Sequence, residues 1–219
     1  DSCWVDLRNI KLDYVLDIVQ FDDVEFGGLV TGKVHLKSVM KNIMGLWMIQ
    51  SVKKEWKEEL SFAQICEQAS KEEITSLVDC NDDCFLAPKS MIEAVQTFCR
   101  ESNQQIPETI GEIAAVIYNS LAKCYGETIR EIEEITGNTY DTIYVVGGGA
   151  NAGYLNELTA KYTKKKVSAG PTEATAIGNI TVQMLHDGVF TSLPEARTCI
   201  GKSFDIRHYD ENGNENQEV

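Results

Sequence analysis

Apolar residues recur at three- and four-residue steps through most of the chain between residues 36 and 136. This spacing predicts amphipathic helices over 36–59, 61–69, 88–100 and 108–136. The last of them carries a row of isoleucines and stops at Gly137, a residue type that commonly ends a helix. We expect the apolar faces of these helices to be buried in a core.

The pattern changes on both sides of this helical region. Residues 2–36 mix β-branched and aromatic residues with glycines, which predicts short strands and turns. After the long helix, 141–146 predicts a strand, 151–162 a helix and 167–169 a second strand. A last long helix is expected over 172–188. Strands that alternate with helices are typical of the α/β class.

The composition becomes strongly acidic near the C-terminus. Residues 209–219 hold four acids and no base, which is typical of a disordered segment. We therefore expect one domain over residues 1–205 and a disordered tail over 206–219.

The whole chain is acidic as well, with 20 basic and 34 acidic residues among 219 and a net charge of −14. Such a chain repels nucleic-acid phosphates and anionic membranes unless its bases are clustered, and the sequence has no basic stripe. It also has no recognisable signal peptide and no apolar run of the roughly 18 residues that span a membrane. We expect neither nucleic acid nor a membrane as a partner.

The seven cysteines are scattered and odd in number, which is typical of free thiols in a reducing compartment. The closest pair, Cys80 and Cys84, has no second pair of ligands nearby to complete a zinc site. We expect a cytoplasmic protein without a metal site of its own.

The strongest chemical feature is a strand that runs into Gly147, Gly148 and Gly149 and then into a helix. Glycine lets a ligand approach the backbone closely, and free amides at the start of a helix attract phosphate. A nucleotide site and a plain tight turn fit this local pattern about equally well. The spacing Gly147-x-Gly149-x-x-Ala152 also fits a loose dinucleotide fingerprint, but the next strand ends without the acid that would hold the ribose.

Several longer motifs together resemble one protein family. They are Val145–Asn151 with Leu155-Asn156, Ala169–Asn179, Lys41–Trp47 with Gln50, and more weakly Asn81–Asp83. These motifs resemble the C-terminal, nucleotide-binding half of the FGGY carbohydrate kinases, and within that family they are most similar to the rhamnulokinases. The resemblance covers about residues 1–200.

This resemblance implies an actin-like ATPase lobe of the ribonuclease-H-like type, with a mixed sheet flanked by helices. Complete FGGY kinases hold most of the sugar site and the catalytic aspartate in an N-terminal lobe, so no catalytic residue is expected in this chain. The implied reaction transfers the γ-phosphoryl group of ATP, with Mg²⁺, to the 1-hydroxyl of L-rhamnulose, and the chain alone would be inactive without that lobe. The alternatives are a kinase for another ketose or polyol, and a nucleotide-binding lobe without catalysis.

The resemblance also implies roles for single residues. The residues on the ATP side are Gly147, Gly148, Gly149, Gln50 and Cys3, and the residue on the sugar side is Asn42. On one helix, Asn42 and Gln50 would lie about 12 Å apart along the axis and face one cleft, with Trp47 turned inward.

The opening Asp1-Ser2-Cys3-Trp4 departs from the family's usual Ser-Gly-Thr-Trp. A thiol is a weaker hydrogen-bond donor toward phosphate than the hydroxyl that it replaces. This departure is the feature that favours a lobe without catalysis.

Overall fold

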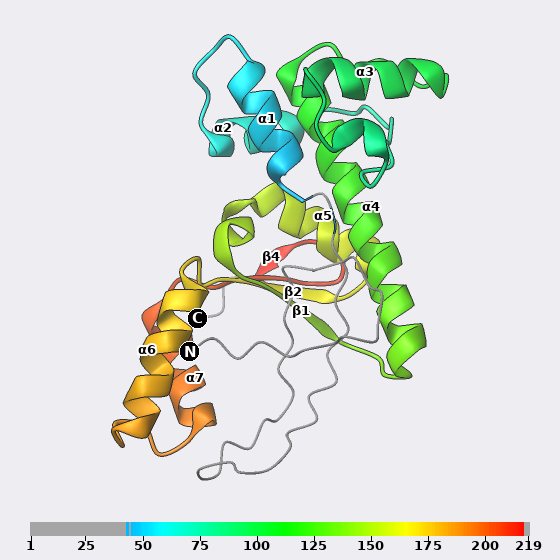
Figure 1. Ribbon diagram of the computed structural model, residues 1–219. Coiled ribbons are helices and arrows are strands. Elements are labelled where there is room, and N and C mark those ends of the chain that lie inside the picture. The colour runs from blue at the N-terminus through cyan, green and yellow to red at the C-terminus, as the bar shows by residue number, and fades with distance from the viewer. Residues whose placement is uncertain (1–42, 44, 217–219) are drawn as a thin grey trace.

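The computed structural model describes residue 43 and residues 45–216, which form a helical part and an α/β part (Figure 1). The strands expected within residues 2–36 lie outside these residues. The helical part consists of α1 (Trp47–Glu55), α2 (Phe62–Ala69), the 3-10 helix η1 (Asp83–Phe85), α3 (Met91–Glu101) and α4 (Ile110–Thr136). The α/β part consists of β1 (Thr142–Val145), the 3-10 helix η2 (Gly147–Asn151), α5 (Gly153–Thr163), β2 (Lys166–Ala169), α6 (Ala174–His186), α7 (Leu193–Ser203), β3 (Arg207–Tyr209) and β4 (Glu215–Asn216).

Polar side chains mark the starts of three predicted helices. Ser61, Ser90 and Thr109 each accept a hydrogen bond from the backbone N–H three residues on, at the starts of α2, α3 and α4. The long helix α4 ends at Gly137, whose φ of +69° is one that glycine adopts readily. These three predicted helices are confirmed, and their ends move by no more than three residues.

The first predicted helix is shorter than the 36–59 expected and is turned differently, since α1 begins at Trp47 and ends at Glu55. Residues 45 and 46 form a turn before it, so the single helix expected to carry both Asn42 and Gln50 is interrupted there. The buried side of α1 includes Met48, Ile49 and Val52. Trp47 is 39% exposed, and its indole N–H donates to the Phe85 carbonyl at 3.4 Å. The prediction that Trp47 points inward is wrong, because the ring lies near the surface, where its polar N–H has a partner.

The strands form one four-stranded mixed sheet in the order β1-β2-β3-β4. β1 and β2 are parallel and are joined through η2 and α5, and β3 and β4 continue the sheet with antiparallel pairings. α5 packs on β2 and along α4, so that these two helices lie over the same side of the sheet (Figure 1). The α/β class and the strand–helix–strand unit predicted from the sequence are confirmed.

The C-terminal segment joins the sheet, in contrast to the disordered tail expected over 206–219. β3 pairs with β2 and buries Tyr209, which is 4% exposed. In the turn that follows, the Asp210 carboxylate accepts hydrogen bonds from the backbone N–H groups of Asn212 and Asn214. An acid that binds the backbone of its own turn supports a hairpin, which the acidic composition alone does not reveal.

Two helices separate β2 from β3. The helix predicted over 172–188 corresponds to α6, whereas α7 was not predicted. Ser192 marks the start of α7 by accepting a hydrogen bond from the Glu195 N–H. Within the part of the chain that the structure describes, no helix is both long enough and apolar enough to cross a membrane.

An ion pair fastens α4 to the amino ends of β1 and β2. Lys165 Nζ donates to Glu133 Oε1 at 2.7 Å and to the Tyr140 carbonyl at 2.6 Å, and the Glu133 carboxylate accepts the Tyr140 N–H at 2.9 Å. The Lys165 and Glu133 side chains are only 12% and 21% exposed. Burial alone would raise the pKa of Glu133, but the hydrogen bonds from Lys165 and Tyr140 and the Lys165 charge hold this pKa below its ordinary value.

Replacing Lys165 by methionine should lower the free energy of unfolding by about 1–3 kcal/mol at neutral pH, since the Glu133 carboxylate then lacks its cation. The depressed pKa means that ionised Glu133 stabilises the fold above the ordinary glutamate range and loses this effect as the pH falls through its folded value. The difference between variant and parent should therefore shrink below a pH of about 4.3 in urea unfolding.

The pair of Lys123 and Glu127 provides the matched control. Their charged atoms lie 3.9 Å apart on the surface of α4, and both side chains are about half exposed. Lys123→Met should change the free energy of unfolding by less than about 0.5 kcal/mol. Equal losses in the two variants, or a Lys165 effect that persists in acid, would contradict the role given to Lys165.

Candidate functional site

The carboxyl ends of β1 and β2 lie side by side because the two strands are parallel neighbours. β1 leads into η2, and β2 leads into the cis peptide Gly170-Pro171 and then α6. The Gly170 N–H donates to the Val145 carbonyl at 2.8 Å, and the Thr172 hydroxyl donates to the Asn151 side-chain oxygen at 3.3 Å. Two turns that are distant in sequence thus form one edge, the place where open α/β sheets bind ligands.

The three glycines of the first turn differ in what the fold asks of them. Gly147 has a φ of +72°, which favours glycine over any residue with a Cβ. A Cβ at Gly149 would lie 3.3 Å from Val145 Cγ1. Gly148 has no such reason, because its φ lies outside the left-handed region and a Cβ would meet no atom within 4 Å. Gly148 is also exposed, so its backbone is open to a ligand from outside.

Polar side chains hold this turn from the protein side. Asn156, which is 1% exposed on α5, donates through Nδ2 to the Gly149 and Ala150 carbonyls at 3.3 and 3.2 Å. From β3, Arg207 Nη2 donates to the Ala150 carbonyl at 2.8 Å. In the sequence, Asn156 stands out only as part of a motif and Arg207 does not stand out at all, because no local pattern connects residues 57 positions apart.

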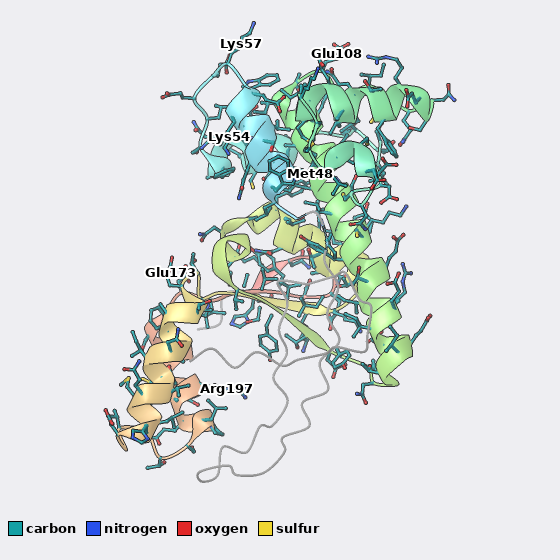
Figure 2. All side chains as sticks on the ribbon, viewed as in Figure 1. Met48, Lys54, Lys57, Glu108, Glu173 and Arg197 are labelled. Carbon is teal, nitrogen blue, oxygen red and sulfur yellow. The ribbon has the colours of Figure 1, made fainter. Side chains whose placement is uncertain are left out.

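The second turn also depends on a glycine. Gly170 has a φ of +133°, and a Cβ there would lie 2.7 Å from the Asp205 carbonyl oxygen. Glu173 follows at the start of α6, at the end of the helix nearest the sheet (Figure 2), and its side chain caps no backbone N–H. α6 thus begins with N–H groups that no side-chain cap satisfies, as α1 and α5 also do, whereas α2, α3, α4 and α7 are capped.

Within the described residues, no observed contact brings the other residues assigned from the sequence to this edge. Gln50 is exposed on α1, a helix that packs against α3 and α4. Cys3 and Asn42 lie outside the described residues. The structure therefore unites Gly147, Gly148 and Gly149 with the second turn, while the roles of Gln50, Cys3 and Asn42 stay predictions.

The cysteines of the described part do not form a reactive centre. None of the six forms a disulfide within the described residues. Burial raises the pKa of Cys80, Cys84 and Cys99, and Asp82 adds to the effect at Cys84, so these thiols are protonated at neutral pH. Among residue 43 and residues 45–216, no group of three His, Cys, Asp or Glu side chains is arranged to hold a metal ion.

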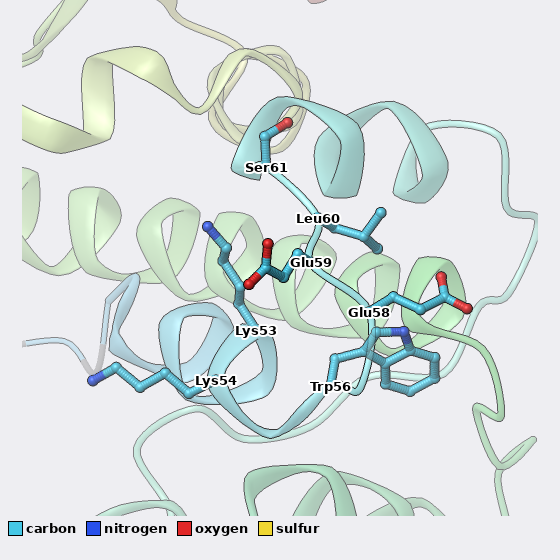
Figure 3. A pocket seen from close by; sticks show the side chains of 7 residues that line it. All are labelled: Lys53, Lys54, Trp56, Glu58, Glu59, Leu60 and Ser61. Atoms are coloured by element: carbon cyan, nitrogen blue, oxygen red, sulfur yellow. The ribbon is translucent and has the colours of Figure 1, made fainter.

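A surface hollow of about 580 Å³ lies between the end of α1 and the start of α2 (Figure 3). The residues that line it are Lys53, Lys54, Trp56, Glu58, Glu59, Leu60 and Ser61. Lys53 Nζ already lies over the Phe62 ring, 4.3 Å from its centre. Because bases and acids mix around this hollow, it favours neither anion nor cation, and the edge beside β1 and β2 is the stronger candidate.

The edge is suited to binding a ligand through its backbone. It offers the accessible peptide groups around Gly148 and the uncapped start of α6. Its polar side chains are Asn151, Thr172 and Glu173, and no hydrogen-bonded pair of nucleophile and base occurs among them. The arrangement fits a site that positions a phosphate-bearing ligand for chemistry supplied from elsewhere.

The chain is similar to known proteins over most of its length. The model of the C-terminal domain of the FGGY family of carbohydrate kinases matches residues 28–186. A rhamnulokinase of Oceanobacillus iheyensis is 46% identical over 170 residues, covering 78% of this chain and 36% of the relative. A rhamnulokinase of Ligilactobacillus salivarius is 46% identical over 171 residues, with 78% and 35% covered, and one of Halalkalibacterium halodurans is 45% identical over 170 residues, with 78% and 36% covered.

The chain thus spans little more than a third of the length of the curated relatives that it matches. The family match includes both turns at the strand ends, together with α1 and its Gln50. The chain belongs to the FGGY family of carbohydrate kinases, and it corresponds to their C-terminal domain.

Proposed function

We propose that the edge formed by the two turns binds ATP and that the chain is the nucleotide-binding part of a sugar kinase of the rhamnulokinase type. The observation that carries this proposal is Gly148, whose backbone is exposed at the end of β1 although the fold sets no requirement for glycine there. Gly178 and Gly201 share this freedom, but both lie within helices. Among the glycines that the structure describes, only Gly148 combines this freedom with the end of a parallel strand.

The phosphoryl transfer would need more than this chain provides. The relatives are called rhamnulokinases, and we infer that the complete protein transfers the γ-phosphoryl group of ATP to the 1-hydroxyl of L-rhamnulose. Their additional length accommodates a second lobe, in which we place the sugar site and the catalytic base. Within this proposal the chain orients the nucleotide, and closure of the two lobes excludes water from the reaction.

Magnesium fits this division of roles. Mg²⁺ keeps several waters and is usually held through substrate phosphates and one or two carboxylates, so that the chain need not supply a cage of its own. Within the described residues, no three His, Cys, Asp or Glu side chains are placed to hold an ion, so the proposal brings Mg²⁺ in with the nucleotide. When bound, Mg²⁺ would offset negative charge on the transferred group.

The proposed architecture is an actin-like lobe of the ribonuclease-H-like type. The mixed sheet and the helices α4 and α5 over one side of it support this assignment. The position of the glycine turn after β1 supports it too, since the ligand would then lie at the carboxyl ends of the parallel pair.

Titration of the chain with Mg-ADP up to about millimolar should shift the amide NMR signals of Gly147, Gly148 and Gly149 and of residues near Gln50. Gly148→Val should weaken this binding at least about tenfold, because the new side chain occupies the space through which the nucleotide reaches the backbone. Thermal unfolding of this variant should stay close to that of the parent, since a Cβ at Gly148 meets no neighbour.

Gly201→Val is the matched control, because a Cβ at Gly201 also meets no neighbour and Gly201 lies in α7, outside both turns. It should bind Mg-ADP like the parent. NADH serves as the ligand control. Preference for NADH, or unchanged Mg-ADP binding by Gly148→Val, would contradict the proposed site.

The second prediction concerns the whole reaction. Joined to the N-terminal lobe of the Oceanobacillus iheyensis rhamnulokinase, the chain should phosphorylate L-rhamnulose with ATP, whereas the chain alone should be inactive. A coupled assay of ADP release over a panel of ketoses and polyols measures this. Activity restricted to another sugar would replace the substrate, and Mg-ADP binding without any phosphorylation would favour a lobe without catalysis.

A further inference from the structure

The segment that leads into β3 contacts both turns of the candidate site. The Asp205 carbonyl oxygen lies against Gly170, at 2.7 Å from where a Cβ would stand. Two residues on, the Arg207 side chain reaches the first turn and donates to the Ala150 carbonyl at 2.8 Å. The family model ends at residue 186, so this contribution comes from a part of the chain that the family match does not cover.

Arg207 occupies a confined place beneath the first turn. The Ala150 carbonyl accepts hydrogen bonds from Arg207 and from the buried Asn156. At Gly153, the first residue of α5, a Cβ would lie 3.3 Å from Arg207 Nη1 and 3.5 Å from the Tyr209 hydroxyl. The guanidinium group therefore has room because residue 153 lacks a side chain.

We propose that Arg207 is a positioning residue for nucleotide binding, which holds the turn Gly147–Asn151 in the conformation that presents its backbone to the nucleotide. The proposal rests on the proposed function of this turn as an ATP site. Arg207 acts through the turn and is not itself assigned a contact with the nucleotide.

The physical basis lies in the peptide group. A trans peptide is planar and holds its C=O and N–H pointing in opposite directions. A cation that fixes the Ala150 carbonyl on the protein side therefore also fixes the N–H of Asn151 away from Arg207. A turn that is already ordered loses no conformational freedom when the nucleotide binds. The affinity for the nucleotide is then not lowered by a fraction of molecules in which the turn is disordered.

The guanidinium group suits this task better than an ammonium group. Its planar, rigid fork holds several donors in fixed directions, so that one nitrogen can bond Ala150 while another lies beside Gly153. A lysine in this position would keep the charge and one hydrogen bond but lose the fixed geometry. Arg207→Lys should therefore act as a partial replacement.

The first test needs no nucleotide. The NMR order parameters of the Gly148–Asn151 backbone, measured on the full chain, should be about 0.85 in the parent. They should fall below about 0.6 in Arg207→Met. Lys165→Met is the control, because it removes another largely buried cation, which lies at the amino ends of the same strands. It should lower the stability of the fold without loosening the turn.

The second test measures Mg-ADP affinity by titration of the same variants. Arg207→Met should weaken binding about tenfold, Arg207→Lys should recover part of the loss, and Lys165→Met should bind like the parent at a temperature where it is folded. If Arg207→Met does not fold, Gly153→Ala takes its place in the test. Its methyl group crowds the Arg207 guanidinium without removing the charge, and Mg-ADP binding should again become weaker.

The two tests separate the inference from the function on which it rests. An ordered turn in Arg207→Met, or an affinity loss equal to that of Lys165→Met, would overturn the role of Arg207. A parent chain that does not bind Mg-ADP would overturn the proposed function, while the order parameters would still decide whether Arg207 fixes the turn.

Discussion

Parallel pairing of β1 with β2 is the constraint on which the other parts of the molecule depend. Parallel neighbours cannot be joined by a tight hairpin, so the chain must cross over one face of the sheet, and α5 is that crossover. The loops that leave the two strands then emerge at the same edge. The hydrogen bond from the Gly170 N–H to the Val145 carbonyl extends the pairing one step into these loops. The position of the candidate site thus depends first on the direction of the two strands, and side chains then determine its detailed shape.

The same strand pair is fastened at both ends by cations that come from outside it. At the amino ends, Lys165 connects the loops before β1 and β2 to α4 through Tyr140 and Glu133. At the carboxyl ends, Arg207 connects the first turn to β3. In both places a positive side chain satisfies a backbone carbonyl that no strand partner reaches. β1 and β2 have only four residues each, and the ends of such short strands fray easily. The hydrogen bonds from Lys165 and Arg207 hold these ends in place.

Much of the fold could be predicted from the sequence because most of its helices and strands have local sequence signals. The isoleucine-rich α4 and the β1–α5–β2 unit have strong periodicity and clear end signals, such as Gly137. The orientation of Trp47 was missed because an aromatic ring with a polar N–H fits a surface as well as a core. The hairpin after Tyr209 was missed because pairing with β2 is a long-range contact that composition does not encode. In the site, the glycine turn stands out in the sequence as a strand that runs into three glycines and a helix, and the family resemblance implied its role. Arg207 was not predicted, since its contact with Ala150 exists only in the folded chain.

The pairing of β2 with β3 also bears on the order in which the protein is made. Ala169 and Arg207 are register partners, and two helices are synthesised between them. On a ribosome, the glycine turn therefore emerges well before the strand that carries its support. Local contacts form first and distant ones later, so the helices around α4 can fold while the turn is still unsupported. The support from Arg207 then reaches the glycine turn only after both α6 and α7 have been synthesised.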